Sequence, residues 1–231
     1  MSLGLGISLS ATGSEPWSPK RLPDLIHWFR FRTGITADAE LDVKEWRDEK
    51  EGGWKATADG GTSTSPDLES DGTIKFHSGT NILTFDERLD LREYSVYFKL
   101  NWKSDDTIGA NEDLAEHDAD NFIKLTGPTS IRFKIDGNRH DFTINEIIEG
   151  TPFVLGVERD TEGAMTVYKD NNAAEADEGE GTQTASDLLK ISRFGKPTQT
   201  SYWYEVIICD QGLSVTNRNN LYNYLSNVGY Y

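Results

Sequence analysis

Ser201-Tyr-Trp-Tyr-Glu-Val-Ile-Ile-Cys-Asp-Gln-Gly-Leu-Ser-Val-Thr-Asn-Arg-Asn-Asn-Leu-Tyr-Asn-Tyr-Leu-Ser-Asn-Val-Gly229 is an apolar segment that runs through a turn into a helix-like pattern. Residues 203–209 predict a strand, and Asp-Gln-Gly after them predicts a turn. Ser214 suits the N-cap of the helix, and Gly229 suits its left-handed end. The apolar face of that helix consists of Leu221, Tyr222 and Leu225. The sequence therefore predicts a strand that leads into a short capped helix.

Three upstream segments carry further strand patterns. Leu25-Ile-His-Trp-Phe-Arg-Phe31 is a short apolar run, and residues 43–58 follow the pattern Val-x-x-Trp-x-Asp, then glycine, then Ala-Thr. Residues 72–85 contain two apolar runs around a glycine turn. Together with the closing strand and helix, these segments resemble the laminin-G-like, concanavalin-A-like jelly-roll domains over about residues 22–229.

This resemblance implies an all-β fold, namely an antiparallel two-sheet jelly-roll sandwich over residues 22–231 with a short C-terminal helix. Tight turns at 136–138 and 160–163 predict two hairpins, and residues 95–102 alternate between apolar and polar side chains. Strands at this spacing predict two sheets, each strand with one half-wetted face. Two features depart from the family pattern. Asn217 stands where a capping-box glutamate is common, and the segment 104–120 is longer and more acidic than expected.

Composition limits the classes of function. The 231 residues carry a net charge of −16, which argues against nucleic-acid binding and against anionic membrane surfaces. The apolar runs are too short to span a bilayer, and the N-terminus has no basic region typical of a secretory signal. Cys209 is the single cysteine, so an internal disulfide is impossible, and its apolar strand predicts a buried thiol.

Residues 1–21 form a separate, Gly- and Ser-rich N-terminal arm. Its large aliphatic residues alternate with Gly or Ser, which favours docking on the domain or on a neighbouring chain over an exposed tail. Trp17, between two prolines, is the expected anchor. A disordered leader is the alternative. The opening Met-Ser-Leu-Gly-Leu-Gly resembles the start of small tailed-phage virion proteins. The predicted docking residues are Leu3, Leu5, Ile7, Leu9 and Trp17.

One short motif suggests catalysis. Glu40-Leu-Asp-Val-Lys-Glu45 matches the Glu-x-Asp-x-x-Glu pattern of retaining β-glucanases. Those enzymes share the sandwich architecture that the resemblance implies for this chain. Glu40 would then be the nucleophile, Asp42 the electrostatic helper and Glu45 the acid/base. However, the motif lies near the start of an acidic chain and beside a Gly-Gly loop. A solvated acidic turn is the preferred interpretation.

The segment 104–120 contains seven carboxylates, one histidine and no basic residue. Calcium prefers six to eight oxygen ligands of this kind, although no EF-hand spacing is present. A flexible solvated loop is the main interpretation. A calcium site is the alternative, with the candidate ligands Asp105, Asp106, Asp118 and Asp120. No other cofactor is expected, because the four histidines are scattered and no phosphate loop occurs.

Two tryptophans, Trp17 and Trp54, lie outside the apolar strands. Trp54 follows a Gly-Gly loop, so it is either packed in that loop or is a glycan contact, because sugar faces stack on exposed aromatic rings.

These observations predict a non-catalytic structural protein of a tailed-phage virion, either a capsid decoration or a tail- or fibre-associated subunit. Its partners would be other virion proteins that contact the arm, or further copies of the chain. The alternative is a carbohydrate-binding module for a host-surface glycan, and the lesser alternative is a retaining β-glucanase.

Overall fold

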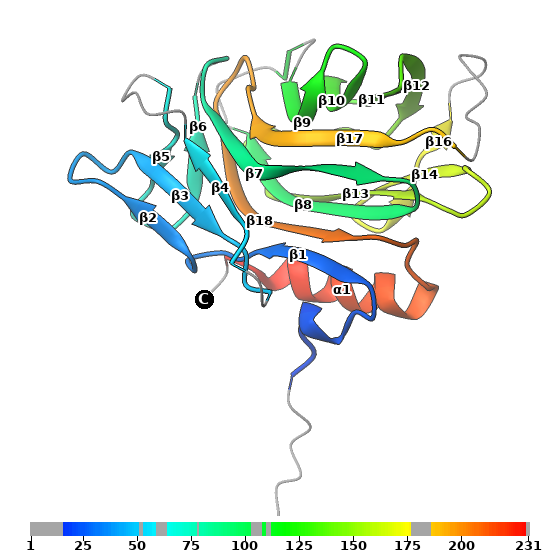
Figure 1. Cartoon of the computed structure of the whole chain (residues 1–231), viewed down its shortest axis with the longest axis horizontal. Coiled ribbons are helices and arrows are strands. Elements are labelled where there is room, and N and C mark those ends of the chain that lie inside the picture. The colour runs from blue at the N-terminus through cyan, green and yellow to red at the C-terminus, as the bar shows by residue number, and fades with distance from the viewer. Residues whose placement is uncertain are drawn as a thin grey trace, which may run out of the picture.

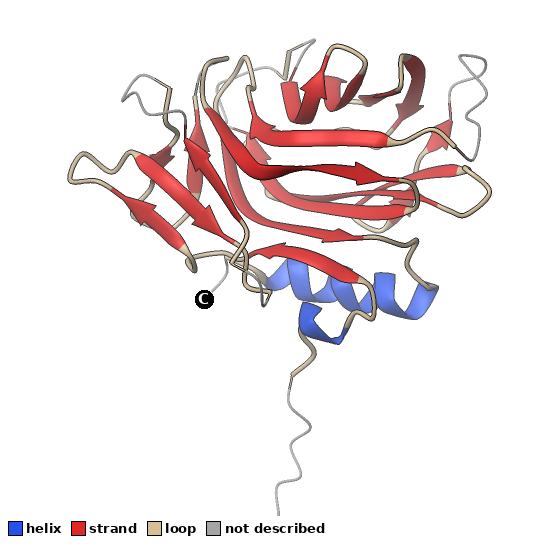
Figure 2. Ribbon diagram, viewed as in Figure 1, coloured by secondary structure: helices blue, strands red, loops and turns tan. Residues whose placement is uncertain are grey.

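The computed structural model describes residues 16–50, 53–58, 64–77, 79–102, 108–109, 112–176 and 186–229. Two antiparallel sheets are stacked in a sandwich, and one helix lies outside it (Figures 1 and 2). In chain order the elements are η1 Pro19–Arg21, β1 Leu25–Phe29, β2 Ile35–Ala37, β3 Val43–Arg47, β4 Lys55–Ala58, β5 Asp67–Leu68, β6 Ile74–Phe76, β7 Ile82–Leu91, β8 Tyr94–Trp102, β9 Glu112–Asp118, β10 Asn121–Gly127, β11 Ser130–Ile135, β12 Asn138–Thr143, β13 Phe153–Arg159, β14 Met165–Lys169, β15 Asn172–Ala173, β16 Glu175–Ala176, β17 Leu189–Gly195, β18 Ser201–Cys209 and α1 Val215–Asn227.

The first sheet has the strand order β15-β14-β13-β8-β18-β6-β5, and β1 also pairs with β18. The second has the order β16-β12-β11-β10-β9-β17-β7-β4-β3-β2. β18 is central because it pairs with β8 along one edge and with β6 and then β1 along the other. The predicted all-β, two-sheet jelly-roll sandwich with a C-terminal helix is therefore confirmed.

The space between the sheets is filled by aromatic rings gathered around Phe194 of β17. The ring centroid of Phe194 lies 4.5 Å from that of Phe85 and 5.1 Å from that of Phe29, both in edge-on geometry. Phe98 and Trp203 enter the same cluster from β8 and β18. Burying each of these side chains contributes about 1.5–3 kcal/mol, so this cluster is a main source of stability.

A second, smaller core lies on the outer face of the first sheet. Alternate residues along its strands point outward, where α1 and η1 cover them (Figure 1). Trp28 and Ile207 pair across β1 and β18 on this face, while the next residues, Phe29 and Val206, face the sandwich interior. Leu221 and Leu225 of α1 are fully buried against it. The two cores share the first sheet between them.

The helix is capped as predicted, and an ion pair that was not predicted holds it to the sheet. The Ser214 hydroxyl accepts the Asn217 amide at 3.2 Å, and Gly229 has a φ of 88° at the other end. Glu158 of β13 receives the Arg218 guanidinium, with Nη2 2.6 Å and Nε 3.1 Å from its carboxylate oxygens. The Tyr97 hydroxyl donates to the same carboxylate at 2.6 Å. α1 is therefore held to the sheet by a buried ion pair as well as by apolar packing.

Local predictions hold along most of the chain. The hairpin turn at Asp136-Gly137 joins β11 to β12 with positive φ at both residues, as a two-residue turn between twisted strands requires. Val96, Phe98, Leu100 and Trp102 all face the main core. Cys209 is buried, and burial raises the pKa of its thiol to about 12. No described helix has the length and apolar character needed to cross a bilayer.

Two expectations were wrong. Not every strand of the first sheet has a solvent-exposed face, because every residue of β13 is buried beneath α1 or inside the sandwich. Residues 112–118 do not belong to a solvated loop but form β9, in which Glu112 and Glu116 are buried. Glu112 accepts the Thr198 amide at 2.7 Å, and Glu116 pairs with Arg193. These acids are tolerated inside because each has a specific donor.

Candidate functional site

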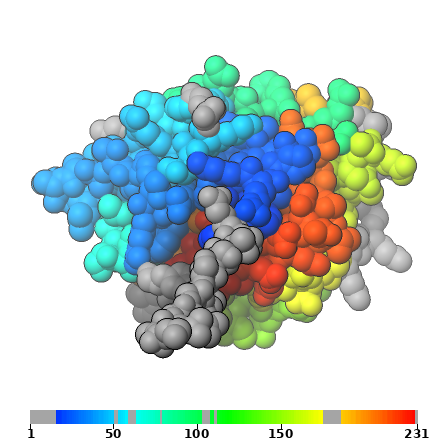
Figure 3. All heavy atoms as spheres, turned by 90° about the horizontal axis from the view of Figure 1, so that it is seen from below, coloured from blue at the N-terminus to red at the C-terminus, as the bar shows by residue number. Residues whose placement is uncertain are grey.

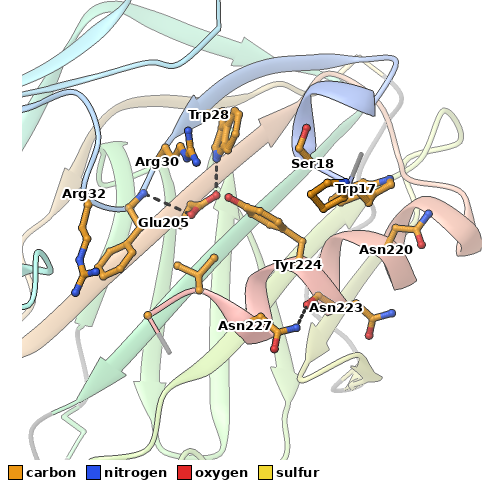
Figure 4. A pocket seen from close by; sticks show the side chains of 14 residues that line it. Trp17, Ser18, Trp28, Arg30, Arg32, Glu205, Asn220, Asn223, Tyr224 and Asn227 are labelled. Carbon is orange, nitrogen blue, oxygen red and sulfur yellow. Dashed lines mark hydrogen bonds between the residues drawn. The ribbon is translucent and has the colours of Figure 1, made fainter. Parts of the chain in front are cut away.

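A cleft of about 590 Å³ lies outside the first sheet, where η1, the end of β1 and α1 meet (Figure 4). In Figure 3 the blue N-terminal residues meet the orange and red C-terminal ones on this face. We call it the α1–β1 cleft. Its volume is in the range of small-ligand pockets. The lining residues used below are Trp17, Trp28, Arg30, Arg32, Glu205, Asn220, Asn223, Tyr224 and Asn227.

The floor of the cleft is the carboxyl group of Glu205, on β18. The Trp28 indole N–H donates to its Oε1, and the Phe31 amide lies 3.4 Å from its Oε2. The Tyr224 hydroxyl is a further hydrogen-bond partner. Burial nevertheless dominates and raises the pKa of Glu205 to about 7. The carboxyl therefore changes charge near neutral pH while it joins β1, β18 and α1.

Aromatic rings form one wall. Trp17, just before η1, has its ring centroid 6.0 Å from that of Tyr224, and Trp28 meets Tyr224 edge-on at 6.2 Å. Trp28 is buried, whereas Trp17 and Tyr224 are half-buried. The cleft thus presents apolar ring surface close to polar groups, an arrangement suited to amphipathic ligands.

The helix contributes a row of carboxamides. Asn220, Asn223 and Asn227 are three and four residues apart, so they lie along one face of α1 beside Tyr224 (Figure 4). Asn223 and Asn227 are exposed. A carboxamide has two donor hydrogens and an acceptor oxygen, which match the mixed donor and acceptor character of hydroxyl groups. In Asn227 one of these donors is used, because its Nδ2 donates to the Asn223 carbonyl at 2.7 Å.

Two arginines also line the cleft. Arg30 and Arg32 flank Phe31 in the turn that follows β1, and Arg32 lies at the opposite end of the cleft from Trp17 and Asn220 (Figure 4). The Arg30 guanidinium carbon is 5.2 Å from the centroid of the Trp28 ring. Glu205 is the only acidic residue among the described lining residues.

Of the predicted arm residues, Leu3, Leu5, Ile7 and Leu9 lie outside the described residues. Trp17 packs on the domain itself, against Tyr224, and Pro19 beside it is buried. Docking of the preceding residues on a neighbouring chain stays a prediction. Trp17, predicted as an anchor, is also part of the α1–β1 cleft.

Trp54 occupies a different place. Its ring is stacked on His27, with centroids 4.0 Å apart and an angle of 15° between the planes, and it also contacts Phe85. Trp54 is half-buried against the main core and does not line the α1–β1 cleft. A glycan contact at Trp54 stays a prediction.

Two of the four candidate calcium ligands, Asp118 and Asp120, lie among the described residues. Asp105 and Asp106 lie outside the described residues. Asp118 Oδ1 accepts the Asp120 amide at 2.9 Å, and Asp120 Oδ1 binds Lys134 at 2.7 Å. Within the described part of the chain, no three His, Cys, Asp or Glu side chains are close enough to hold a metal ion. The calcium site stays a prediction.

The Glu-x-Asp-x-x-Glu motif is not a solvated turn throughout. Glu40 is exposed, but Asp42 is buried and Glu45 lies on β3. Arg47, and then Lys55, hold the pKa of Glu45 below its usual value, although burial opposes them. A glycosidase acid needs a raised pKa, so the environment of Glu45 opposes that role.

Most of the cleft is not identified by the sequence analysis. Glu205 belongs to the predicted closing strand and Asn220 to the predicted helix, and neither is predicted there as a site residue. The spacing of Asn220, Asn223 and Asn227 was a usable signal, since these residues share a helix face with Tyr224. Arg30 and Arg32 gave no local signal, because their position depends on β1 pairing with β18.

No protein family model and no curated protein matches this chain. Solved structures do match it. The botulinum neurotoxin type G receptor-binding domain has a TM-score of 0.58 and 14% identity, over 87% of this chain and 51% of that domain. The binding domain of botulinum neurotoxin DC in complex with SialylT has a TM-score of 0.60 and 12% identity, over 87% of this chain and 51% of that domain.

A third similar structure is that of botulinum neurotoxin type C, a toxin whose cell entry is described as dependent upon interaction with two ganglioside molecules. Its TM-score is 0.57 and its identity 13%, over 87% of this chain and 51% of that chain. At such low identity these likenesses show the fold alone, a β-sandwich. The chain spans about half the length of these neighbours, so their ligands are not transferred to it as findings.

Proposed function

We propose that this chain is a non-catalytic carbohydrate-binding module and that the α1–β1 cleft receives the sugar. The composition of the cleft carries the proposal. The half-buried rings of Trp17 and Tyr224 lie beside a row of carboxamides on α1. Sugar rings combine apolar faces with hydroxyl edges, so they fit a site that combines aromatic rings with amide donors and acceptors.

Two further observations support the proposal. The similar structures include binding domains described with SialylT and with gangliosides, which are glycan ligands of those proteins. The candidate catalytic residue Glu45 is held by two cations rather than poised as an acid. Binding without turnover is therefore the activity that this chain supports best.

The test compares two tryptophan variants by calorimetry against a panel of soluble oligosaccharides. Trp17→Ala removes one wall of the cleft and should weaken binding about tenfold or more, which corresponds to about 1.4 kcal/mol. Trp54→Ala is the matched control, since Trp54 lies outside the cleft, and it should keep the native affinity. Thermal unfolding of both variants accounts for any loss of folded protein.

Each other outcome has a definite meaning. Loss of binding in Trp54→Ala but not in Trp17→Ala would place the sugar at the Trp54 loop. An absence of heat with every oligosaccharide of the panel would count against a carbohydrate-binding module.

We also propose a structural role in a tailed-phage virion, as a capsid decoration or a tail- or fibre-associated subunit that docks through its arm. The alternating Leu3, Leu5, Ile7 and Leu9 favour this second role. Because Trp17 and Pro19 pack on the domain, the arm should be cut before residue 16. Light scattering should find an assembled full-length protein and a monomeric truncated one. Two monomers would argue against self-assembly through the arm.

A further inference from the structure

The α1–β1 cleft carries two positive charges, although the whole chain has a net charge of −16. Arg32 lies at one end of the cleft and Arg30 lies over the Trp28 ring, nearer its middle (Figure 4). Glu205 is the one acidic residue among the described lining residues. Glu205 is 1% exposed and engaged by the Trp28 indole N–H. A ligand in the cleft therefore meets two guanidinium groups and a largely covered carboxyl group.

The backbone at Arg32 is in a conformation that residues with a side chain rarely adopt. Its φ is 59°, and the Thr33 amide bonds the Arg30 carbonyl at 3.2 Å across the tight turn. Glycine is the usual residue at such a position because it has no Cβ to clash. Arg32 therefore lies at a backbone position that disfavours side chains, directly beside the cleft.

The Arg32 side chain is also fixed in direction. Its Nε donates to the Asp71 carbonyl at 2.7 Å, and its guanidinium carbon lies 4.8 Å from the centroid of the Phe31 ring. Gly72 makes room for it, since a Cβ there would lie 2.4 Å from Arg32 Cγ. Arginine loses much rotamer freedom when it binds a ligand, and a side chain already oriented loses less.

Arg30 is oriented by the aromatic wall. Its guanidinium lies over the Trp28 ring, and it hydrogen-bonds the Tyr224 hydroxyl. Its side chain is still 47% exposed, and its nearest carboxylate, that of Glu49, is 4.0 Å away. This long contact contributes little, so a carboxylate from a ligand can compete with it.

We infer that the sugar bound by the α1–β1 cleft is an acidic saccharide whose carboxylate lies against Arg30, while Arg32 adds positive charge at the end of the cleft. The inference rests on the proposed function and names the class of sugar for the same cleft. Guanidinium groups match the planar carboxylate in geometry and charge, and such charge-assisted hydrogen bonds are stronger than neutral ones. The aromatic and carboxamide end of the cleft would receive the adjoining neutral part of the saccharide.

Sialic acids and uronic acids both supply the required carboxylate, so the experiment uses a matched pair for each with the full-length protein. 3′-Sialyllactose is compared with lactose, and trigalacturonate is compared with its methyl ester, which keeps the sugar and removes the charge. The acidic member of at least one pair should bind about tenfold more tightly than the neutral one. Its affinity should also fall as salt is added.

Three arginine variants assign the effect. Arg32→Gly suits the left-handed backbone and should fold normally while it loses part of the preference for the acidic sugar. Arg30→Gln should lose the same preference. Arg88→Gln is the control, because it removes an equal charge from an exposed Arg–Asp pair on β7, outside the cleft. That variant should keep the native preference, with unfolding temperatures recorded for all three.

The outcomes distinguish failure of this inference from failure of the proposed carbohydrate-binding function. Equal or tighter binding of the neutral sugars, with Arg30→Gln and Arg32→Gly unchanged, would overturn the acidic class and leave the carbohydrate-binding module standing. A preference that Arg88→Gln loses equally would reduce the effect to net charge and would also overturn the inference. Failure of all four sugars to bind would overturn the inference and count against the module itself.

Discussion

Glu205→Gln should make the protein more stable at alkaline pH, an unusual result for a buried, hydrogen-bonded residue. The Glu205 carboxyl is 1% exposed, and burial raises its pKa from the ordinary 4.5 to about 7, outweighing the hydrogen bonds from Trp28 and Tyr224. Glutamine keeps the shape and an acceptor oxygen for the Trp28 indole but carries no charge at any pH.

The sign follows from proton binding. Below pH 4.5 the carboxyl is protonated in the folded and the unfolded chain, so it adds no pH dependence. Between pH 4.5 and about 7 only the folded chain holds the proton, so the stability of the native protein falls as the pH rises. At about 1.4 kcal/mol per pH unit, the loss is about 3 kcal/mol and is complete above pH 7.

Urea denaturation between pH 4.5 and 8 measures this directly. The free energy of unfolding of Glu205→Gln minus that of the native protein should grow by about 3 kcal/mol across this range, or roughly 6–12 °C in Tm. Glu45→Gln is the control of opposite sign, because Arg47 lowers the pKa of Glu45 and that carboxylate stabilises the fold only when ionised. Parallel pH curves for the native protein and Glu205→Gln would refute the reasoning.

Three further changes test the packing, each by urea denaturation at pH 7. Gly195→Ala should cost about 2 kcal/mol or more, since φ is +88° and a Cβ would lie 2.3 Å from the Phe76 ring; an unchanged midpoint would contradict this. Ser214→Ala should cost about 1 kcal/mol through the lost cap, and Ser214→Asp should restore it. Arg218→Met should cost about 3 kcal/mol because Glu158, 6% exposed, loses its partner; Glu158→Gln in the same chain should recover part of this.

The strands were predictable because each pattern is local. Alternation in residues 95–102 follows from the pleat of one strand, and the Asp136-Gly137 turn follows from the twist of two adjacent strands. The helix was predictable for the same reason, since Ser214 and Gly229 act on the backbone beside them. The resemblance to jelly rolls added the stacking of the two sheets, which no local pattern contains.

Burial of the acidic residues of β9 was not predictable, because the residues that bind their carboxylates lie far along the chain. Glu112 is satisfied by Thr198 and Glu116 by Arg193, both about eighty residues away. The α1–β1 cleft fails local analysis in the same way, since the Trp28 indole N–H donates to Glu205 across 177 positions. The composition of residues 104–120 shows only that the segment is acidic. It does not show that hydrogen-bond donors from distant parts of the chain reach Glu112 and Glu116.

The pairing of β1 with β18 has a consequence for how the chain reaches its native state. β1 is made early, yet the strand that completes it, and the helix that covers its outer face, are made almost two hundred residues later. During synthesis Trp28 stays uncovered until α1 has been made, whereas β7 can already pair with β4, which precedes it in the chain. Closing so long a loop is entropically costly, so we expect folding in milliseconds to seconds, with the first sheet the last to close. Chaperones that shield apolar strands would act on this interval.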